Sequence, residues 1–419
     1  MIARLLIPVI VLTVLPYLWI DRQYLHIPKG KRKILYWLPA AIVIGYTAYL
    51  TLEPDFLPAN PVFIDIWFGM MALLAVPQFV FAFTSFVGWE CMKLSRRFKA
   101  KKGDGRFRGS VHRARNWGKL VGIFLAVWAF FSFIYGFTMG VRQFQVKHLT
   151  VYVPDLPEAF EGYRIVHFSD IHVGSYYGWR RHMPQRDVDS INAQHPDLIC
   201  FTGDLQNVRP EELVPFKKTL SGLKAKDGVV SVLGNHDYTY YMNVDDEAEI
   251  RRIEEKVQQT EREMGWHLLM NEHFVLHRGK DSIYVAGTEN FKKPSRAEVA
   301  QALYGIKKGQ FVLMLQHIPE MWKDMTPSRI NEKYGSKDSV LVAPQLTLSG
   351  HTHGGQVSVL GLRPSMFSAF DYGLYEREGC QLYTTAGLGG TIPIRIGATP
   401  EIVVITLKRK YDDQITIFQ

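Results

Sequence analysis

The 419-residue sequence contains only three cysteines, Cys91, Cys200 and Cys380. No two of them form a CxxC pair, which excludes a zinc knuckle and a dense disulfide framework. The spacing leaves a Cys200–Cys380 bridge open for an oxidising compartment. Cys200 lies within an apolar, strand-like run, however, and this position favours a small buried thiol.

Charged residues are missing from three long stretches of the N-terminal third. The runs 34–52, 66–89 and 120–140 contain no Asp, Glu, Lys or Arg. Each has roughly the 20 residues that a helix needs to cross a bilayer. A shorter run, 5–20, is interpreted as a further span rather than a signal peptide, because no small-residue cleavage site follows it. The sequence therefore predicts an all-α transmembrane region over 1–140 with about four helices.

The whole chain has a net charge of +9, but its C-terminal two thirds have no excess of basic residues. Residues 1–140 carry 17 basic and 6 acidic side chains, whereas 141–419 carry 32 basic and 34 acidic ones. This balance argues against a nucleic-acid-binding domain. Lys and Arg concentrate in the loops 22–33 and 93–119, while Glu53 and Asp55 lie in the loop between them. Because basic loops favour the cytoplasmic side, the C-terminal domain of this multi-pass cell-membrane protein is predicted to be extracytoplasmic.

Beyond residue 145, short β-rich runs alternate with helical patterns, which is typical of layered α/β domains. Five apolar runs end in side chains of the types that can bind metals. These side chains are Asp170 and His172, then Asp204, then Asn235, His236 and Asp237, then His317, and finally His351 and His353. Sites in such domains form beyond the carboxyl ends of strands, so these distant residues are predicted to meet in one place.

The donor types and their spacing indicate a metal centre. Alternate residues of an extended segment project to the same side, so Asp170 with His172, and His351 with His353, can each reach one centre. A set of nitrogen and oxygen donors without thiolate suits Mn, Fe, Zn or Mg better than it suits a structural zinc site. Glycines at 203, 234 and 350 suit sharp turns and close backbone approach.

With these motifs in this order, the sequence resembles the calcineurin-like metallophosphoesterase superfamily over roughly residues 145–410. The stretch 387–401 resembles the ending of a bacterial, membrane-associated branch of that superfamily. The resemblance implies an α/β domain over 145–419, built as a four-layer αββα metallophosphoesterase sandwich and preceded by the transmembrane helices. It also implies metal-dependent hydrolysis of a phosphodiester, phosphomonoester or pyrophosphate.

The resemblance further implies a dinuclear centre with two divalent metal ions. One ion would be held by Asp170, His172 and His353, the second by Asn235, His317 and His351, and both by Asp204. His236 would donate a proton near the leaving oxygen, and Asp237 would fix the ring of His236. The chain departs from the family pattern at Asn207, where many members have an aspartate, and this departure bears on the tuning of the metals.

The expected partners are the lipid bilayer and a phosphate-ester substrate, with no nucleic acid. Attachment to the membrane favours a lipid-linked substrate, because it raises the local concentration of such a molecule. Two alternatives remain. One is an enzyme resembling UDP-2,3-diacylglucosamine pyrophosphatase at the cytoplasmic face, which the predicted topology opposes. The other is a non-catalytic membrane sensor with a phosphoesterase-like domain.

Overall fold

The computed structural model describes residues 2–53, 55, 58, 60–101, 116–336, 339–359 and 361–409. The chain divides into two compact units, Met1–Phe137 and Thr138–Gln419. Part of the basic loop used to predict the membrane topology, residues 102–115, lies outside the described residues, as does the C-terminal segment 410–419.

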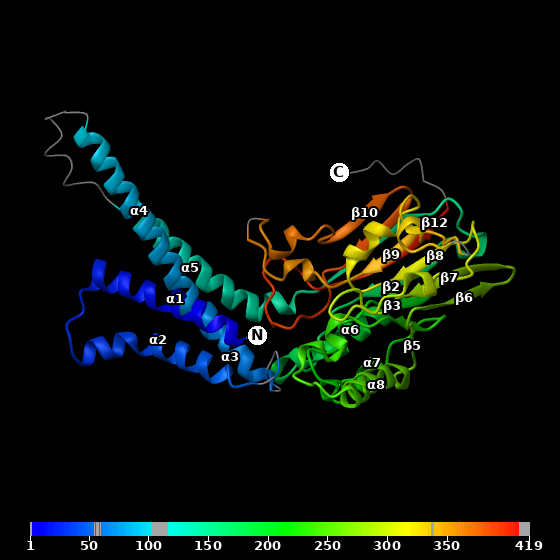
Figure 1. Cartoon of the computed structure of the whole chain (residues 1–419), viewed down its shortest axis with the longest axis horizontal. Helices are drawn as coiled ribbons and strands as arrows, with labels where there is room; N and C mark the ends of the chain where they lie inside the picture. The colour runs from blue at the N-terminus through cyan, green and yellow to red at the C-terminus, as the bar shows by residue number, and fades with distance from the viewer. Residues whose placement is uncertain are drawn as a thin grey trace. The chain divides into compact units, whose positions relative to one another are not determined.

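The N-terminal unit is helical (Figure 1). Its helices are α1 (Ile2–Ile20), α2 (Lys31–Leu50), α3 (Pro61–Met70), α4 (Val76–Lys101) and α5 (Trp117–Thr138), with π-helical segments η1 (Asp21–Leu25) after α1 and η2 (Met71–Ala75) between α3 and α4. By length and composition, four segments can cross a membrane: Leu5–Leu25, Lys31–Leu50, Pro61–Phe98 and Trp117–Arg142. The prediction of four apolar N-terminal helices is confirmed.

Each helical stretch begins before the charge-free run that predicted it. The run 34–52 corresponds to a helix that begins at Lys31, and the run 66–89 lies inside a continuous helical stretch from Pro61 to Lys101. Backbone hydrogen bonds do not require apolar side chains, and Lys or Arg at a span end can extend its charge towards water. Charge-free runs therefore mark the part of a helix suited to the bilayer interior rather than the ends of the helix.

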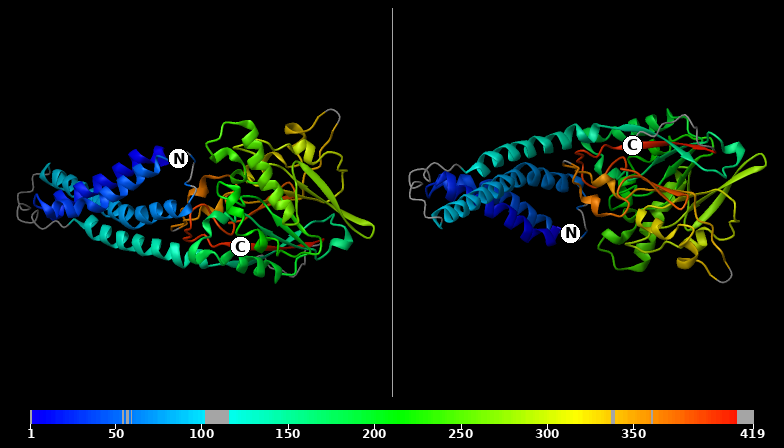
Figure 2. Two further views of the ribbon diagram at one scale, coloured as in Figure 1. Left: turned by 90° about the horizontal axis from the view of Figure 1, so that it is seen from below. Right: turned by 90° about the horizontal axis from the view of Figure 1, so that it is seen from above.

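Helices α4 and α5 pack through small residues, and the two helices run side by side in Figures 1 and 2. A Cβ atom added to Gly118 would lie 2.2 Å from the carbonyl oxygen of Thr84, and one added to Gly88 would lie 2.7 Å from the Cα of Gly118. Glycine at these positions permits the close backbone approach by which helices associate in membranes.

Substituting Gly118 with leucine is expected to push α4 and α5 apart, because the nearest obstacle is backbone and cannot rotate away. The expected loss of unfolding free energy is about 1–3 kcal/mol, as for other overpacked sites. Thermal unfolding of the purified protein in detergent measures it. Gly45→Leu is the matched control, since a Cβ at Gly45 meets nothing within 4 Å. Equal melting temperatures for the two variants would contradict this packing.

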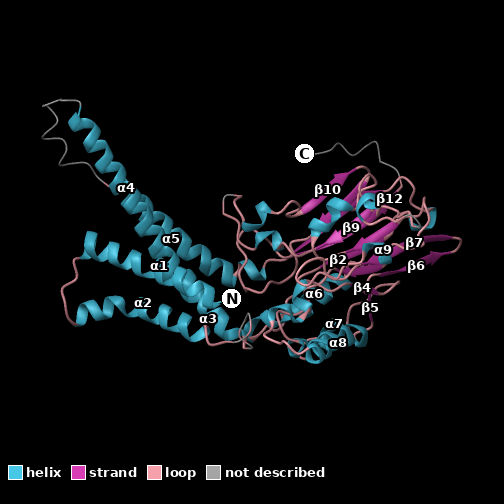
Figure 3. Ribbon diagram, viewed as in Figure 1, coloured by secondary structure: helices cyan, strands magenta, loops and turns pink. Residues whose placement is uncertain are grey.

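The second unit contains two six-stranded sheets (Figure 3). The first has the order β1-β12-β2-β3-β4-β5, with bounds β1 Gln145–Tyr152, β12 Glu401–Lys408, β2 Arg164–Phe168, β3 Leu198–Phe201, β4 Val229–Ser231 and β5 Trp266–Leu268. The second has the order β10-β11-β9-β8-β7-β6, with bounds β10 Gly373–Arg377, β11 Cys380–Thr384, β9 Leu346–Ser349, β8 Val312–Leu315, β7 Asp281–Gly287 and β6 Glu272–Arg278. Strands β2 to β5 are mutually parallel, as are β7, β8, β9 and β11.

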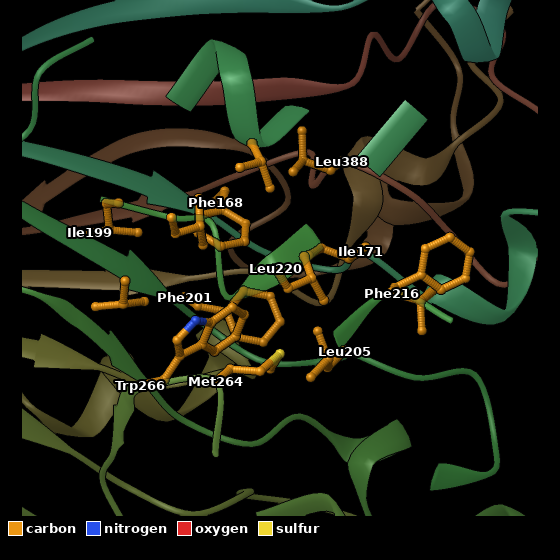
Figure 4. Close-up of a cluster of buried hydrophobic side chains, with 14 of the residues drawn as sticks. Phe168, Ile171, Ile199, Phe201, Leu205, Phe216, Leu220, Met264, Trp266 and Leu388 are labelled. Atoms are coloured by element: carbon orange, nitrogen blue, oxygen red, sulfur yellow. The ribbon is translucent and has the colours of Figure 1, made fainter. Parts of the chain in front are cut away.

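Three hydrophobic clusters show how the layers pack. One combines buried residues of both sheets, such as Ile165 of β2 and Leu313 of β8, and therefore lies between them. In another, Phe168 and Phe201 of the first sheet pack with buried residues of the helices α6 (Met183–Asn192), α7 (Lys217–Leu220) and α8 (Glu247–Glu263) (Figure 4). The third covers the second sheet near the short helices α9 (Val299–Ala302) and α10 (Ile330–Lys333). The αββα class predicted from the sequence is confirmed.

The cysteines are free thiols. Cys200 belongs to the cluster between the sheets, whereas Cys380 belongs to the cluster over the second sheet. The bridge that the spacing left open is therefore not formed, and both thiols act as small apolar side chains.

Candidate metal centre

The predicted ligands converge at the carboxyl ends of strands from both sheets. In the first sheet, β2 leads to Asp170 and His172, β3 to Asp204, and β4 to Asn235. In the second sheet, β8 leads to His317, while β9 leads to His351 and His353. The centre therefore lies where the two sheets meet, and each sheet supplies part of it.

One donor group contains Asp170, His172, Asp204 and His353, whose donor atoms all lie within 4.8 Å of one another. The Nε2 atoms of His172 and His353 are 3.3 Å apart, and Nε2 of His353 is 3.3 Å from Oδ1 of Asp170. Nε2 of His172 is 3.5 Å from Oδ2 of Asp204. Four nitrogen and oxygen donors from three strands thus face one point.

A second donor group contains Asp204, His317 and His351. Nε2 of His317 lies 3.2 Å from Oδ2 of Asp204, 3.0 Å from Oδ1 of Asn235 and 3.2 Å from Nδ1 of His351. The amide oxygen of Asn235 therefore joins this group. The same oxygen of Asp204 faces both groups, which is the arrangement required of a carboxylate shared by two cations.

The electrostatics of the donors suit cation binding. Burial lowers the pKa of His172 to about 3 and that of His351 to about 3, so both rings are neutral at physiological pH and present lone pairs. Burial opposes ionisation of Asp204, but the neighbouring His317 and His236 outweigh it and hold the pKa of Asp204 well below its usual range. The neutral imidazoles of His172 and His351 and the ionised carboxylate of Asp204 are the forms that bind divalent metals. Burial opposes protonation of His317, but Asp204 outweighs it and raises the pKa of this ring to about 9, so His317 must release a proton when a cation binds.

Backbone carbonyls select which ring nitrogen of two histidines faces the centre. Nδ1 of His172 lies 3.1 Å from the carbonyl oxygen of Gln206, and Nδ1 of His317 lies 2.7 Å from that of Thr202. Each Nδ1 donates to its carbonyl, which directs Nε2 at the donor group. Metal-binding histidines commonly have such a carbonyl partner. The residues present therefore fit a pair of divalent cations.

The ligand positions carry backbone strain. Asp170, His172, Asp204, His351 and His353 all have φ between 50° and 75°. They make up five of the eleven non-glycine residues with positive φ in the described part of the chain. Such conformations cost free energy and persist where the surrounding structure enforces them, typically at functional sites. Their concentration here singles out this edge of the sheets.

Two glycines let the ligand loops approach one another. A Cβ at Gly234 would lie 2.2 Å from Oδ1 of Asp204, and a Cβ at Gly350 would lie 2.2 Å from Oδ2 of Asp170. In each case any side chain would displace a predicted ligand. The close approach expected from the sequence is therefore present at both positions, and it involves the carboxylates.

His236 lies beside the donor groups, and its ring packs edge-to-face against His172 with centroids 4.9 Å apart. Nδ1 of His236 donates to the carbonyl oxygen of Asn207 at 2.6 Å. The role expected for Asp237, to fix this ring, stays a prediction, and the hydrogen bonds of Asp237 in the structure go to the backbone and not to the ring. The carboxylate of Asp237 instead accepts hydrogen bonds from four backbone amides, those of Asp204, Leu205, Gln206 and Gly234, at 2.8–3.2 Å. These amides lie beyond the ends of β3 and β4, and the carboxylate of Asp237 is the acceptor that binds them.

Replacing Asp237 with alanine is expected to destabilise the catalytic domain by more than about 3 kcal/mol, since four buried amides would lose their acceptor at about 1–3 kcal/mol each before relaxation. Thermal unfolding should show a lower melting temperature together with weakened metal binding. Asp155→Ala removes an exposed carboxylate and serves as the control. An unchanged melting temperature in Asp237→Ala would contradict this structural role.

The C-terminal stretch 387–401 supports the ligand loops. Arg395 is buried and donates from Nη1 to the carbonyl oxygen of His353 at 2.9 Å and from Nη2 to that of Gly389. The amide of Gly389 in turn donates to the carbonyl oxygen of Asp170 at 2.8 Å. This stretch thereby ties together ligand loops that follow β2 and β9.

Sequence reasoning missed two groups at the site. The first is the backbone carbonyl of Asn207, which orients His236. In the sequence, Asn207 was noted only because its side chain departs from the aspartate of many family members. Tyr241 contacts both His236 and Asn235, and no motif marks it. A backbone carbonyl leaves no signal in a sequence, and a tyrosine in a loop has many ordinary roles.

Known proteins resemble both parts of the chain. Residues 3–141 match a family model described as a probable calcineurin-like phosphoesterase transmembrane domain, and residues 163–355 match the calcineurin-like phosphoesterase model. A transmembrane protein with metallophosphoesterase domain from Danio rerio is 30% identical over 352 residues, which cover 81% of this chain and 72% of that protein.

Two bacterial relatives are also similar. An uncharacterized metallophosphoesterase of Campylobacter jejuni is 25% identical over 83% of each chain. The uncharacterized metallophosphoesterase YkuE of Bacillus subtilis is 27% identical over 60% of this chain and 82% of its own. Together with the four apolar helices and the cluster of metal-binding side chains, these similarities establish that the chain belongs to the calcineurin-like metallophosphoesterases and is a membrane-linked, metal-dependent phosphoric ester hydrolase.

Proposed function

We propose that the chain is a dinuclear phosphoester hydrolase whose catalytic domain faces the extracytoplasmic side and acts on a lipid-linked phosphate ester. The observation that carries the dinuclear part is the position of Oδ2 of Asp204, which lies 3.5 Å from Nε2 of His172 and 3.2 Å from Nε2 of His317. One carboxylate oxygen thereby faces both donor groups.

The two donor groups define which residues would hold each cation. Asp170, His172 and His353 would hold the first, Asn235, His317 and His351 the second, and Asp204 both. The donors suit Mn, Fe, Zn or Mg. When bound, a pair of such cations neutralises phosphate charge and lowers the pKa of water so that it can attack near neutral pH.

His236 is the proposed general acid. Its Nδ1 donates to the carbonyl oxygen of Asn207, so in the imidazolium form of the ring Nε2 carries the proton that passes to the leaving oxygen, and the ring is left neutral. The ring lies beside His172 without belonging to either donor group, so it can approach the substrate while the ligands keep their positions.

The charge pattern and the spans support the proposed location and substrate. The loop 22–33 is basic and the loop after α2 carries Glu53 and Asp55, which favours cytoplasmic placement of the former and an extracytoplasmic C-terminal domain. Four apolar helices confine the enzyme to the bilayer, where a lipid-linked phosphate is concentrated near the active site.

Hydrolysis by the full-length protein in nanodiscs loaded with Mn²⁺ tests the activity and the substrate class. The substrates are bis-p-nitrophenyl phosphate, p-nitrophenyl phosphate, phosphatidate and a polyprenyl diphosphate, the last two incorporated in the nanodisc. We expect Mn²⁺-dependent turnover, with kcat/KM at least about tenfold higher for a lipid-linked substrate. Faster turnover of both soluble esters would overturn the lipid assignment, and no Mn²⁺-dependent turnover would overturn the proposed reaction.

Reporter fusions after Gln419 test the orientation in a bacterial host. Alkaline phosphatase, which is active only outside the cytoplasm, is expected to be active, and green fluorescent protein exported in the same position is expected to be dark. The opposite pattern would place the catalytic domain in the cytoplasm. A fusion after Arg32, in the basic loop, should give the reverse result in the same experiment.

A further inference from the structure

Tyr241 contacts two predicted site residues with different parts of one side chain. It lies in the turn η11 (Thr239–Tyr241), just after the turn η10 (Asn235–Asp237). The ring of Tyr241 stacks on that of His236, with centroids 4.3 Å apart and 16° between the planes. Its phenolic oxygen accepts a hydrogen bond of 2.8 Å from Nδ2 of Asn235. One residue therefore connects the proposed general acid with a proposed ligand.

The bond to Asn235 holds one end of an amide away from the metal centre. The two ends of a side-chain amide have nearly the same shape, but only the oxygen can bind a cation. Oδ1 of Asn235 lies 3.0 Å from Nε2 of His317, within the second donor group, while the NH₂ group points to Tyr241. The phenolic oxygen anchors the NH₂ group in this orientation and so helps to hold the amide oxygen toward His317.

The ring of Tyr241, stacked on one face of the imidazole, restrains the orientation of His236. The edge of the imidazole is already held by the carbonyl oxygen of Asn207 at 2.6 Å, and His172 packs against it at 84°. A single hydrogen bond to Nδ1 leaves the ring able to tilt about that bond. The parallel face of Tyr241 opposes such a tilt and so keeps Nε2 in one direction.

We infer that Tyr241 is a positioning residue, which presents the oxygen of Asn235 to the second cation through its hydroxyl and holds the plane of His236 through its ring. The inference deepens the proposed function and rests on it for the effect on turnover. The effect on metal binding does not depend on the reaction.

Tyr241→Phe separates the two roles, because it removes the hydroxyl and keeps the ring. In the full-length protein, we expect one of the two Mn²⁺ dissociation constants to rise about 10–100-fold, as for other losses of a group that orients a ligand, and the other to stay unchanged. Electron paramagnetic resonance of free Mn²⁺ during titration measures both. At saturating Mn²⁺, kcat should remain within about threefold of the wild type.

Tyr241→Leu removes both the hydroxyl and the flat ring. Beyond the Mn²⁺ effect, kcat at saturating Mn²⁺ is expected to fall about tenfold or more for aryl phosphates with poor leaving groups and little for good ones, since proton donation matters most for the former. A higher kcat for these poor leaving groups in Tyr241→Phe than in Tyr241→Leu would show that the aromatic ring supports proton donation. Tyr304→Phe and Tyr304→Leu are matched controls at an exposed tyrosine.

Each outcome decides the inference. Unchanged affinities for both Mn²⁺ ions in Tyr241→Phe would overturn the role of the hydroxyl, and equal kcat values in Tyr241→Phe and Tyr241→Leu would overturn the role of the ring. If the wild type binds Mn²⁺ but hydrolyses no substrate, the proposed function fails while the titration still tests Tyr241. If the Tyr241→Leu variant does not fold, the Tyr241→Phe titration still decides the effect on Asn235.

Discussion

Replacing Asp204 with alanine is expected to remove both divalent cations together. Its Oδ2 atom faces both donor groups, at 3.5 Å from Nε2 of His172 and 3.2 Å from Nε2 of His317. Its Oδ1 atom accepts from the amide of His236 at 2.8 Å and so holds the loop after β4 as well. The variant therefore loses the oxygen that both donor groups share and a loop contact in one step.

The measurement is the metal content of the dialysed full-length protein, by mass spectrometry, beside Mn²⁺-dependent hydrolysis of bis-p-nitrophenyl phosphate. Turnover should fall about 10³-fold or more, because several kcal/mol of transition-state stabilisation depend on the cations. His172→Ala and His317→Ala should each weaken the binding of mainly one cation, and Asp155→Ala should change the binding of neither. Two tightly bound cations in Asp204→Ala would contradict the shared carboxylate.

His236→Ala is expected to keep both cations while slowing turnover by about 10²–10⁴-fold. The ring lies outside both donor groups, so its removal leaves the ligands in place, yet it removes the proposed source of the proton. The deficit should grow as the leaving group becomes more basic, because a basic oxygen depends most on protonation as it departs.

A series of aryl phosphates with increasing leaving-group pKa measures this dependence in the wild type and the variant. The rate should depend weakly on leaving-group pKa in the wild type and steeply in His236→Ala. His195→Ala, at an exposed histidine, serves as the control. An equal deficit for good and poor leaving groups would argue against proton donation by His236 and favour a role in binding the phosphate.

The strand-end motifs were informative because they depend on local patterns. Apolar runs of strand length predicted strands, and the position of Asp170, Asp204 or His317 just after a run predicted that it lies at the carboxyl edge of a sheet. The structure brings these residues together from two sheets, since β2, β3 and β4 belong to one sheet while β8 and β9 belong to the other. Which sheet each strand joins depends on pairings between distant segments.

The roles of side chains near the ligands were less predictable. The proximity of Asp237 to His236 in the sequence suggested that it orients the ring, yet its carboxylate accepts from the amides of Asp204 and Gly234. Which groups form a hydrogen bond depends on their positions in the folded chain, and closeness in the sequence does not decide it. The carbonyl of Asn207, 29 residues away from the ring it orients, shows the same point.

The transmembrane character, the α/β class and the donor types could be predicted from the sequence, because hydropathy, periodicity and residue chemistry are local properties. The tertiary structure alone decided that Oδ2 of Asp204 faces two donor groups and that Tyr241 joins Asn235 to His236. It also imposes positive φ on five of the predicted ligands. The shared position of Asp204 arises because loops from two packed sheets meet there, the contacts of Tyr241 arise from the conformation of one loop, and strained loops persist only because the surrounding structure enforces them.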